Sequence, residues 1–194
     1  MKTTPAPASP ATANSSVERT GRGHVFWFFG LSGAGKTTLA TGLAEGLRAE
    51  GRTVLLLDGD ELRAGLCHDL GFSDDARAEN IRRAAELAKL AKEQGQVVLA
   101  AFITPRENLR RLIRSIIGVD RLDMIWVDAP LEVCRRRDPK GLYQRSAAGM
   151  VPFFTGVDSI FEKPVRPELR MQTDRHTVEE LQLELMKFCW KRFG

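Results

Sequence analysis

The sequence predicts an α/β fold, in which a parallel sheet carries helices on both faces and a lid covers the carboxyl edge of the strands. Short apolar runs alternate along the chain with longer stretches in which apolar residues recur at helical spacing. Because parallel strands need long crossover connections, this alternation predicts helices that pack back onto the sheet. Polar segments follow the first three apolar runs, and ligands of such folds gather at the carboxyl ends of the strands.

The expected strands are compact apolar runs, of which the first, residues 25–29, ends at Gly30. The other expected strands are residues 53–57, 97–103, 123–127 and the shorter 169–172. Leucines at helical spacing predict a helix over residues 37–50, which Gly51 ends. Further helices are expected over residues 79–94 and 105–117 and from Val178 onwards.

The length of 194 residues fits one domain, which we expect to occupy residues 23–194. Residues 1–22 are rich in Pro, Ala, Ser and Thr and nearly free of large apolar side chains. Such a segment buries too little surface to offset its ordering entropy, so a flexible arm is expected there. Residues 135–167 have weak periodicity and many Gly, Pro and charged residues, which is typical of a functional lid.

The overall charge and the cysteines restrict the class of protein. A formal charge of +4 suits a phosphorylated small-molecule partner but falls short of indicating nucleic acid. Cys67, Cys134 and Cys189 are odd in number and form no C-x-x-C, which favours a reducing cytoplasm over disulfides or a zinc site. The longest apolar runs are far shorter than the roughly 20 residues of a membrane span, and no apolar signal region follows Met1.

A phosphate-binding loop follows the first expected strand. Residues 30–37 match the pattern G-x-x-x-x-G-K-[ST], and they open an amphipathic helix, which is the context that the pattern requires. The loop backbone and the helix N-terminus would hold the phosphates of ATP, Lys36 would bridge the β- and γ-phosphates, and Thr37 would bind Mg²⁺. The expected nucleotide-binding residues are Gly30, Ser32, Gly33, Ala34, Gly35, Lys36, Thr37 and Thr38. No guanine-reading N-K-x-D motif occurs, so a small kinase is favoured over a GTPase.

Two carboxylates, Asp58 and Asp60, end the second expected strand. Both can face the phosphate loop from a neighbouring strand end, one as proton acceptor and the other ordering the waters of Mg²⁺. A solvated acidic turn is the alternative interpretation. The planar guanidinium group of arginine binds phosphate and sulfate oxygens with two parallel hydrogen bonds. The candidates for binding an anionic acceptor are Arg63, Arg77, Arg82, Arg83 and Arg106.

Six segments in the same order together resemble the adenylyl-sulfate kinases. Beside the phosphate loop they are residues 58–60 (DGD), 69–73 (DLGFS), 79–83 (ENIRR), 137–143 (RDPKGLY) and 154–158 (FTGVD). The resemblance covers roughly residues 24 to 185 and is far more specific than the phosphate loop. It implies a kinase that transfers phosphate from Mg·ATP to the 3′-hydroxyl of adenosine 5′-phosphosulfate. It also implies a homodimer, with a sulfurylase as a further partner.

The resemblance also implies roles for single residues. Asp60 looks like the general base, with Lys36 and Lys140 as the other catalytic side chains, and Arg137 would lie against the ATP adenine. The implied acceptor-binding residues are Asp60, Arg63, Phe72, Arg77, Asn80, Ile103, Thr104, Lys140, Leu142 and Phe154. Phe72 and Phe154 would stack on the acceptor adenine. Without the resemblance they would be interpreted as core residues.

Two departures from the family pattern lie near the expected acceptor. The family usually has Ile-Ser-Pro, an aromatic residue and then arginine after the third strand, whereas residues 103–107 are Ile-Thr-Pro-Arg-Glu. Cys67 stands where an asparagine is common. The departures leave open a related kinase acting on another nucleotide-linked acceptor such as cytidine diphosphoramidate. A rival of another class is a non-catalytic nucleotide-binding regulatory module.

Overall fold

A five-stranded parallel sheet forms the centre of the molecule in the computed structural model, which describes residues 22–150, 154–157 and 159–193. The strand order is β2-β3-β1-β4-β5. The strands are β1 (His24–Phe29), β2 (Val54–Asp58), β3 (Val97–Phe102), β4 (Leu122–Asp128) and β5 (Leu169–Gln172). The predicted α/β class with a parallel sheet is therefore confirmed. The predicted arm, apart from Arg22, lies outside the described residues.

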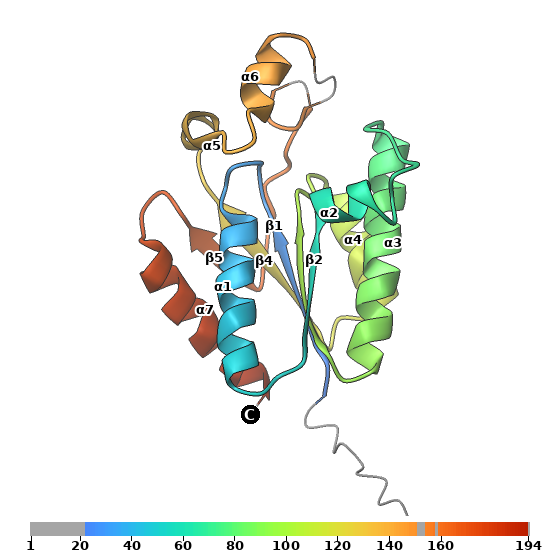
Figure 1. Ribbon diagram of the computed structural model, residues 1–194, viewed down its shortest axis with the longest axis vertical. Coiled ribbons are helices and arrows are strands. Elements are labelled where there is room, and N and C mark those ends of the chain that lie inside the picture. Colours follow the sequence, from blue (N-terminus) through green and yellow to red (C-terminus); the bar gives the residue numbers. More distant parts are fainter. Residues whose placement is uncertain (1–21, 151–153, 158, 194) are drawn as a thin grey trace, which may run out of the picture.

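Two helices cover each face of the sheet (Figure 1). On one face lie α1 (Lys36–Ala49) and α7 (Val178–Phe193), and on the other lie α3 (Asp74–Glu93) and α4 (Glu107–Ile117). Successive side chains of β1 point to opposite faces, so Phe26 and Phe28 pack against α1 and α7. Trp27 and Phe29 pack against α3 and α4. Because both faces are covered, every residue of β1 is buried.

Three short helices lie near the carboxyl ends of the strands (Figure 1). The first, α2 (Gly59–Ala64), follows β2 directly, and α5 (Leu131–Arg137) and α6 (Leu142–Ala147) follow β4. The region expected to be a lid therefore contains helix α6, and its C-terminal part lacks regular helices or strands among the described residues. Within the described ranges, no helix has the length and apolar character needed to cross a membrane.

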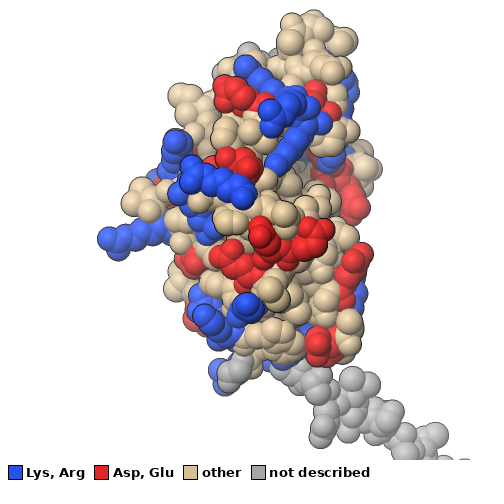
Figure 2. Space-filling model, turned by 90° about the vertical axis from the view of Figure 1, so that its left-hand side faces the viewer, with Lys and Arg blue, Asp and Glu red and all other residues tan. Residues whose placement is uncertain are grey.

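The surface carries a mixture of charges. On the face shown in Figure 2, acidic side chains form a band across the middle, with basic side chains above and below it. The chain as a whole has 29 basic and 25 acidic residues, so neither sign dominates its surface. A mixed surface of this kind keeps a protein in solution without a strong field of one sign.

Candidate active site

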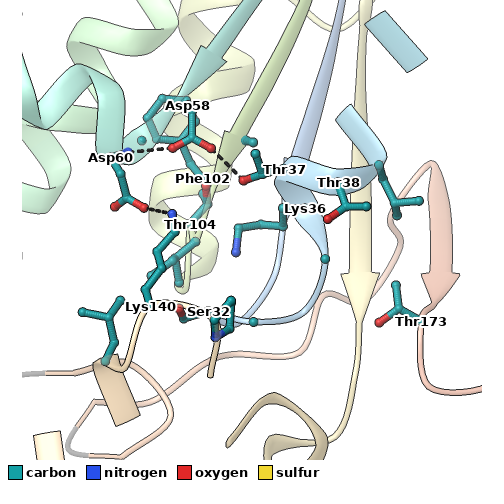
Figure 3. A pocket seen from close by; sticks show the side chains of 18 of the residues that line it. Ser32, Lys36, Thr37, Thr38, Asp58, Asp60, Phe102, Thr104, Lys140 and Thr173 are labelled. Atoms are coloured by element: carbon teal, nitrogen blue, oxygen red, sulfur yellow. Dashed lines mark hydrogen bonds and ion pairs between the residues drawn. The ribbon is translucent and has the colours of Figure 1, made fainter. Parts of the chain in front are cut away.

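A cavity of about 460 Å³ opens at the carboxyl edge of the sheet. Its walls come from the phosphate loop, the end of β2, helix α3, the segment after β3, the α5–α6 region and the segment that leads into α7. Figure 3 shows Lys36, Thr37, Asp58, Asp60 and Lys140 around this space. Side chains that are far apart in the sequence therefore meet at the edge where the sequence analysis placed the site.

The phosphate loop is shaped by close backbone contacts. A Cβ atom on Gly30 would lie 2.1 Å from the carbonyl oxygen of Val127, so no larger residue fits there. Gly35 has a φ of 102° and caps α1, whose N-terminus thereby opens onto the cavity. Ala34 is buried, and its N–H donates to the Leu31 carbonyl at 3.2 Å. Gly30 and Ala34 thus shape the loop, while Ser32, Gly33, Gly35, Lys36, Thr37 and Thr38 line the cavity.

Lys36 is the principal cation of the phosphate loop. Its ammonium group donates to the Leu31 carbonyl at 2.8 Å. Burial lowers the pKa of Lys36 to about 8, although the nearby Asp58 carboxylate acts in the opposite direction. The carbonyl contact keeps the ammonium at the loop, where phosphate oxygens of a nucleotide would meet it.

Thr37 and Asp58 place two hydrogen-bonded oxygen groups in the wall of the cavity. The Thr37 hydroxyl donates to Asp58 Oδ2 at 2.7 Å, and Asp58 Oδ1 accepts the N–H of Asp60 at 2.9 Å (Figure 3). The described residues hold no cluster of three His, Cys, Asp or Glu side chains that would bind a metal on its own. Mg²⁺ prefers few protein oxygens supplemented by phosphates and water, so Thr37 and Asp58 fit it.

The acceptor side begins at Asp60, which forms an ion pair with Lys140 of the α5–α6 region. Burial alone would lower the pKa of Lys140, but the hydrogen bond to Asp60 and the surrounding carboxylates raise it. The carboxylate expected to accept a proton therefore lies next to a cation that is protonated in the free protein.

Three side chains from α2 and α3 line the same side of the cavity. Arg63 donates to the carbonyls of Leu70 and Gly71, and Arg77 Nε donates to the Phe72 carbonyl at 3.0 Å. The amide oxygen of Asn80 is buried and has no hydrogen-bond partner within the described part of the chain. A buried polar atom without a partner in a cavity wall is a site for a ligand donor. Ile103, Thr104 and Leu142 complete the predicted acceptor-side lining.

Several predicted residues do not line the cavity. Phe72 lies outside the lining and is 52% exposed, with the guanidinium of Arg63 4.6 Å from its ring centre. Phe154 is buried and meets the ring of Tyr143 edge-on at a centroid distance of 4.8 Å. In this structure Phe154 is thus a core residue, and its expected stacking on the acceptor would require it to move.

The larger set of candidate arginines was partly wrong. Arg82 and Arg83 bind Glu79 on their own helix, and Arg83 also binds Asp69. Arg106 pairs with Asp74 at 2.8 Å. None of these three cations lines the cavity, and each is already paired with a carboxylate.

The nucleotide side contains residues that the sequence analysis missed. Arg137 donates to the hydroxyl of Thr173 at 2.9 Å and to its carbonyl, and the Thr173 hydroxyl donates to the Ala34 carbonyl at 2.8 Å. His176, Val178 and Leu181 continue this wall. They follow β5 without any motif, so only the parallel pairing of β4 with β5 brings them near the phosphate loop.

The parallel sheet, the phosphate loop with Lys36, and the facing carboxylates define a P-loop kinase. The family model for adenylylsulphate kinase matches residues 22–172. The adenylyl-sulfate kinase of Aeromonas salmonicida is 51% identical over 162 residues, which cover 84% of this chain and 83% of that protein. That of Marinobacter nauticus is 44% identical over 180 residues, covering 93% of this chain and 90% of that protein.

Solved structures agree with the sequence comparison. The Mycobacterium tuberculosis APS kinase CysC, solved in complex with AMPPNP and APS, superposes with a TM-score of 0.83 at 40% identity. The match covers 88% of this chain and 99% of that chain. The present chain therefore belongs to the adenylylsulphate kinase family, as its motifs predicted.

Proposed function

We propose that this chain transfers the γ-phosphoryl group of ATP to the 3′-hydroxyl of adenosine 5′-phosphosulfate, with Asp60 as general base. The products are 3′-phosphoadenosine 5′-phosphosulfate and ADP. One observation carries the assignment of roles: a single cavity holds the phosphate loop, the Asp58–Asp60 turn and the acceptor-side group Arg63, Arg77 and Asn80. The M. tuberculosis relative was solved with APS and an ATP analogue together, which supports the same pair of substrates here.

The donor is held by the loop backbone, the N-terminus of α1 and Lys36. Thr37 and Asp58 would hold Mg²⁺, which when bound neutralises charge on the phosphates. In-line transfer forms a bond between the acceptor oxygen and the γ-phosphorus and breaks the bond between that phosphorus and the β–γ bridging oxygen. Positioning and charge neutralisation supply most of the catalysis in such transfers.

Asp60 takes the proton of the 3′-hydroxyl as the new bond forms. Its carboxylate is 64% exposed at the cavity edge, where a ribose can reach it, and its backbone N–H is fixed by Asp58. Lys140 is the nearest cation to this carboxylate, and the incoming acceptor would exchange places with it. Released from Asp60, the Lys140 ammonium stabilises the charge of the transferring group.

The α5–α6 region acts as a lid in this proposal, over about residues 135–167. Several contacts tie it to the site, among them Lys140 to Asp60, Arg137 to Thr173, and the Tyr143 hydroxyl to the Ser32 carbonyl at 3.0 Å. Closure of such a region excludes water, which would otherwise hydrolyse ATP.

Coupled release of ADP tests the reaction and its acceptor. The purified chain with Mg·ATP is assayed with adenosine 5′-phosphosulfate, with cytidine diphosphoramidate and without acceptor, and we expect turnover with the phosphosulfate. Asp60→Asn should lower kcat by about 10² to 10⁴-fold while the KM for ATP stays the same. Glu61→Gln, at the neighbouring exposed position, is the matched control. Turnover confined to the cytidine compound would overturn the acceptor, and an Asp60→Asn variant with the wild-type rate would overturn the base.

We further propose a homodimer that works in the cytoplasm beside a sulfurylase, which makes the acceptor. The family resemblance supports the dimer, and three buried, free cysteines suit a reducing compartment. Light scattering of the purified chain should give about twice the chain mass of 21.6 kDa. A monomeric mass across the micromolar range would contradict the dimer.

A further inference from the structure

We propose that Trp27 of β1 is a positioning residue for the acceptor side of the site, although it does not line the cavity. Its indole N–H holds Thr104, and its ring supports the Asp58–Asp60 turn through Phe102. The proposal deepens the function proposed above and rests on it. It assigns a role to a side chain that no motif of the sequence indicates.

A buried hydrogen bond joins Trp27 to the cavity wall. The indole Nε1 donates to the hydroxyl oxygen of Thr104 at 3.0 Å. Trp27 is fully buried and Thr104 is 1% exposed, so bulk water does not compete with Thr104 for the indole N–H. Leaving a buried donor without an acceptor costs more free energy than the bond itself contributes, so the two side chains are fixed together.

Thr104 requires such support because of its backbone. Its φ of 42° lies in the left-handed region, which is unfavourable for a β-branched residue. A hydroxyl has one donor and two acceptor sites, and Trp27 occupies one acceptor site. The Thr104 O–H therefore remains available to donate. Since Thr104 lines the cavity beside Ile103, this bond presents it as a donor to an oxygen of the acceptor nucleotide.

The ring of Trp27 supports a second wall of the same side. It stacks on Phe102 at a centroid distance of 4.9 Å and an interplanar angle of 22°. A Cβ atom built on Gly59 would lie 3.0 Å from Cδ1 of Phe102, so the Phe102 ring packs directly beneath this glycine. Gly59 stands between Asp58 and Asp60. The indole thus supports the general base through one aromatic neighbour.

The donor side depends much less on this indole. Trp27 packs in the core between the sheet and helices α3 and α4, whereas α1, which follows the phosphate loop, packs on the opposite face. Loss of the indole N–H should consequently disturb recognition of the acceptor and leave that of ATP nearly unchanged. If Trp27 were merely structural, its replacement would weaken the binding of both substrates together.

Four variants of the full chain test this inference: Trp27→Phe, Thr104→Val, Thr104→Ser and the double variant Trp27→Phe with Thr104→Val. The first keeps an aromatic ring on Phe102 but removes the N–H. Thr104→Val removes the hydroxyl at nearly constant shape, and Thr104→Ser retains it. Trp126→Phe is the matched control, because Trp126 is a buried tryptophan of neighbouring strand β4 that does not line the cavity.

We expect Trp27→Phe and Thr104→Val each to raise the KM for adenosine 5′-phosphosulfate by about threefold to tenfold, the size of one hydrogen bond. The KM for ATP and the acceptor-free hydrolysis of ATP should change less than about twofold. The KM of the double variant should be no higher than that of the poorer single variant, since both substitutions remove the same hydrogen bond. Trp126→Phe should behave like the wild type, and Thr104→Ser should recover most of the affinity for the phosphosulfate that Thr104→Val loses.

Equal increases in both KM values, or effects that multiply in the double variant, would overturn the proposal. Should Trp27→Phe fail to fold, Thr104→Val and Thr104→Ser decide: a serine variant as impaired as the valine variant refutes the role of the hydroxyl. Titration calorimetry of the wild type with adenosine 5′-phosphosulfate separates a wrong role for Trp27 from a wrong proposed function. If the wild type binds the phosphosulfate, the failure concerns Trp27 alone. If the wild type binds another acceptor instead, the same variants are compared with that acceptor.

Discussion

Asp60 and Lys140 are held together in the structure, and this contact has more importance for catalysis than for folding. Both side chains are about half exposed, at 64% and 49%. Ion pairs at such positions contribute little to stability, because water screens them and long side chains lose freedom. Lys140 comes from the α5–α6 region and Asp60 from α2, so the pair links the proposed lid with the proposed base.

Lys140→Ala should therefore lower kcat by about 100-fold, the effect of removing one preorganised cation from a transition state. The melting temperature should change by no more than about 2 °C, as expected for an exposed pair. Lys163→Ala is the control, because Lys163 is exposed in the same half of the chain. Steady-state kinetics and thermal melts measure the two effects. The assignment would be wrong if Lys140→Ala kept the wild-type kcat, or if its loss of activity only matched the loss of folded protein.

The site residues divide into those that the sequence predicts and those that only the fold brings together. The phosphate loop is local, so its pattern and spacing identify Lys36 and Thr37 directly. The wall formed by Thr173 and His176 has no pattern, because its position depends on the pairing of β5 with β4. For Arg82 and Arg83 a signal was present: Glu79 lies three and four residues before them, at the spacing of helical ion pairs.

At the scale of elements, burial decided which predictions were accurate. The strands lie between two helical layers, so continuous apolar runs identify them, and the expected bounds of β5 match the structure. Helix α2 was missed because it has no buried residue and begins with glycine, so no hydrophobic period marks it. Short α5 and α6 have few buried residues and were missed for the same reason.

Helix α3 shows how a capping signal complements periodicity. It begins at Asp74 rather than at Glu79, and the Ser73 hydroxyl accepts the N–H of Ala76 at 3.2 Å as its N-cap. Serine followed by Asp74 and Asp75 is a helix-start signature that was available in the sequence. The first turn packs few apolar residues, which explains why hydrophobic spacing alone placed the start too late.

At the scale of the whole molecule, one polar cluster joins the first strand, the fourth strand and the last helix. His24 of β1 donates to Asp123 of β4 at 2.7 Å, and Arg192 of α7 grips the same carboxylate at 2.8 and 2.9 Å. Asp123 is 3% exposed. The cluster lies at the start of β1, whereas the active site lies beyond its other end, so the cluster bears on stability rather than on catalysis.

The pH dependence of stability should report this cluster. Burial alone would raise the pKa of Asp123, but the hydrogen bonds from His24 and Arg192 outweigh it and hold the pKa below its usual value. A carboxyl group with a lowered folded-state pKa stabilises the fold above its unfolded pKa of about 3.9. That contribution is lost as the pH falls through the lower folded-state value.

Asp123→Asn should accordingly lower the free energy of unfolding by about 2 to 3 kcal/mol at pH 7, the contribution of hydrogen bonds to a charged group. The difference from the wild type should shrink below about pH 4, because protonation removes the same charge from the wild type. Urea unfolding followed by tryptophan fluorescence from pH 3 to 7 measures both effects. Asp120→Asn, an exposed carboxylate just before β4, is the control and should change neither. A difference that stayed constant across this pH range would mean that Asp123 acts by packing, and that its charge does not hold β1, β4 and α7 together.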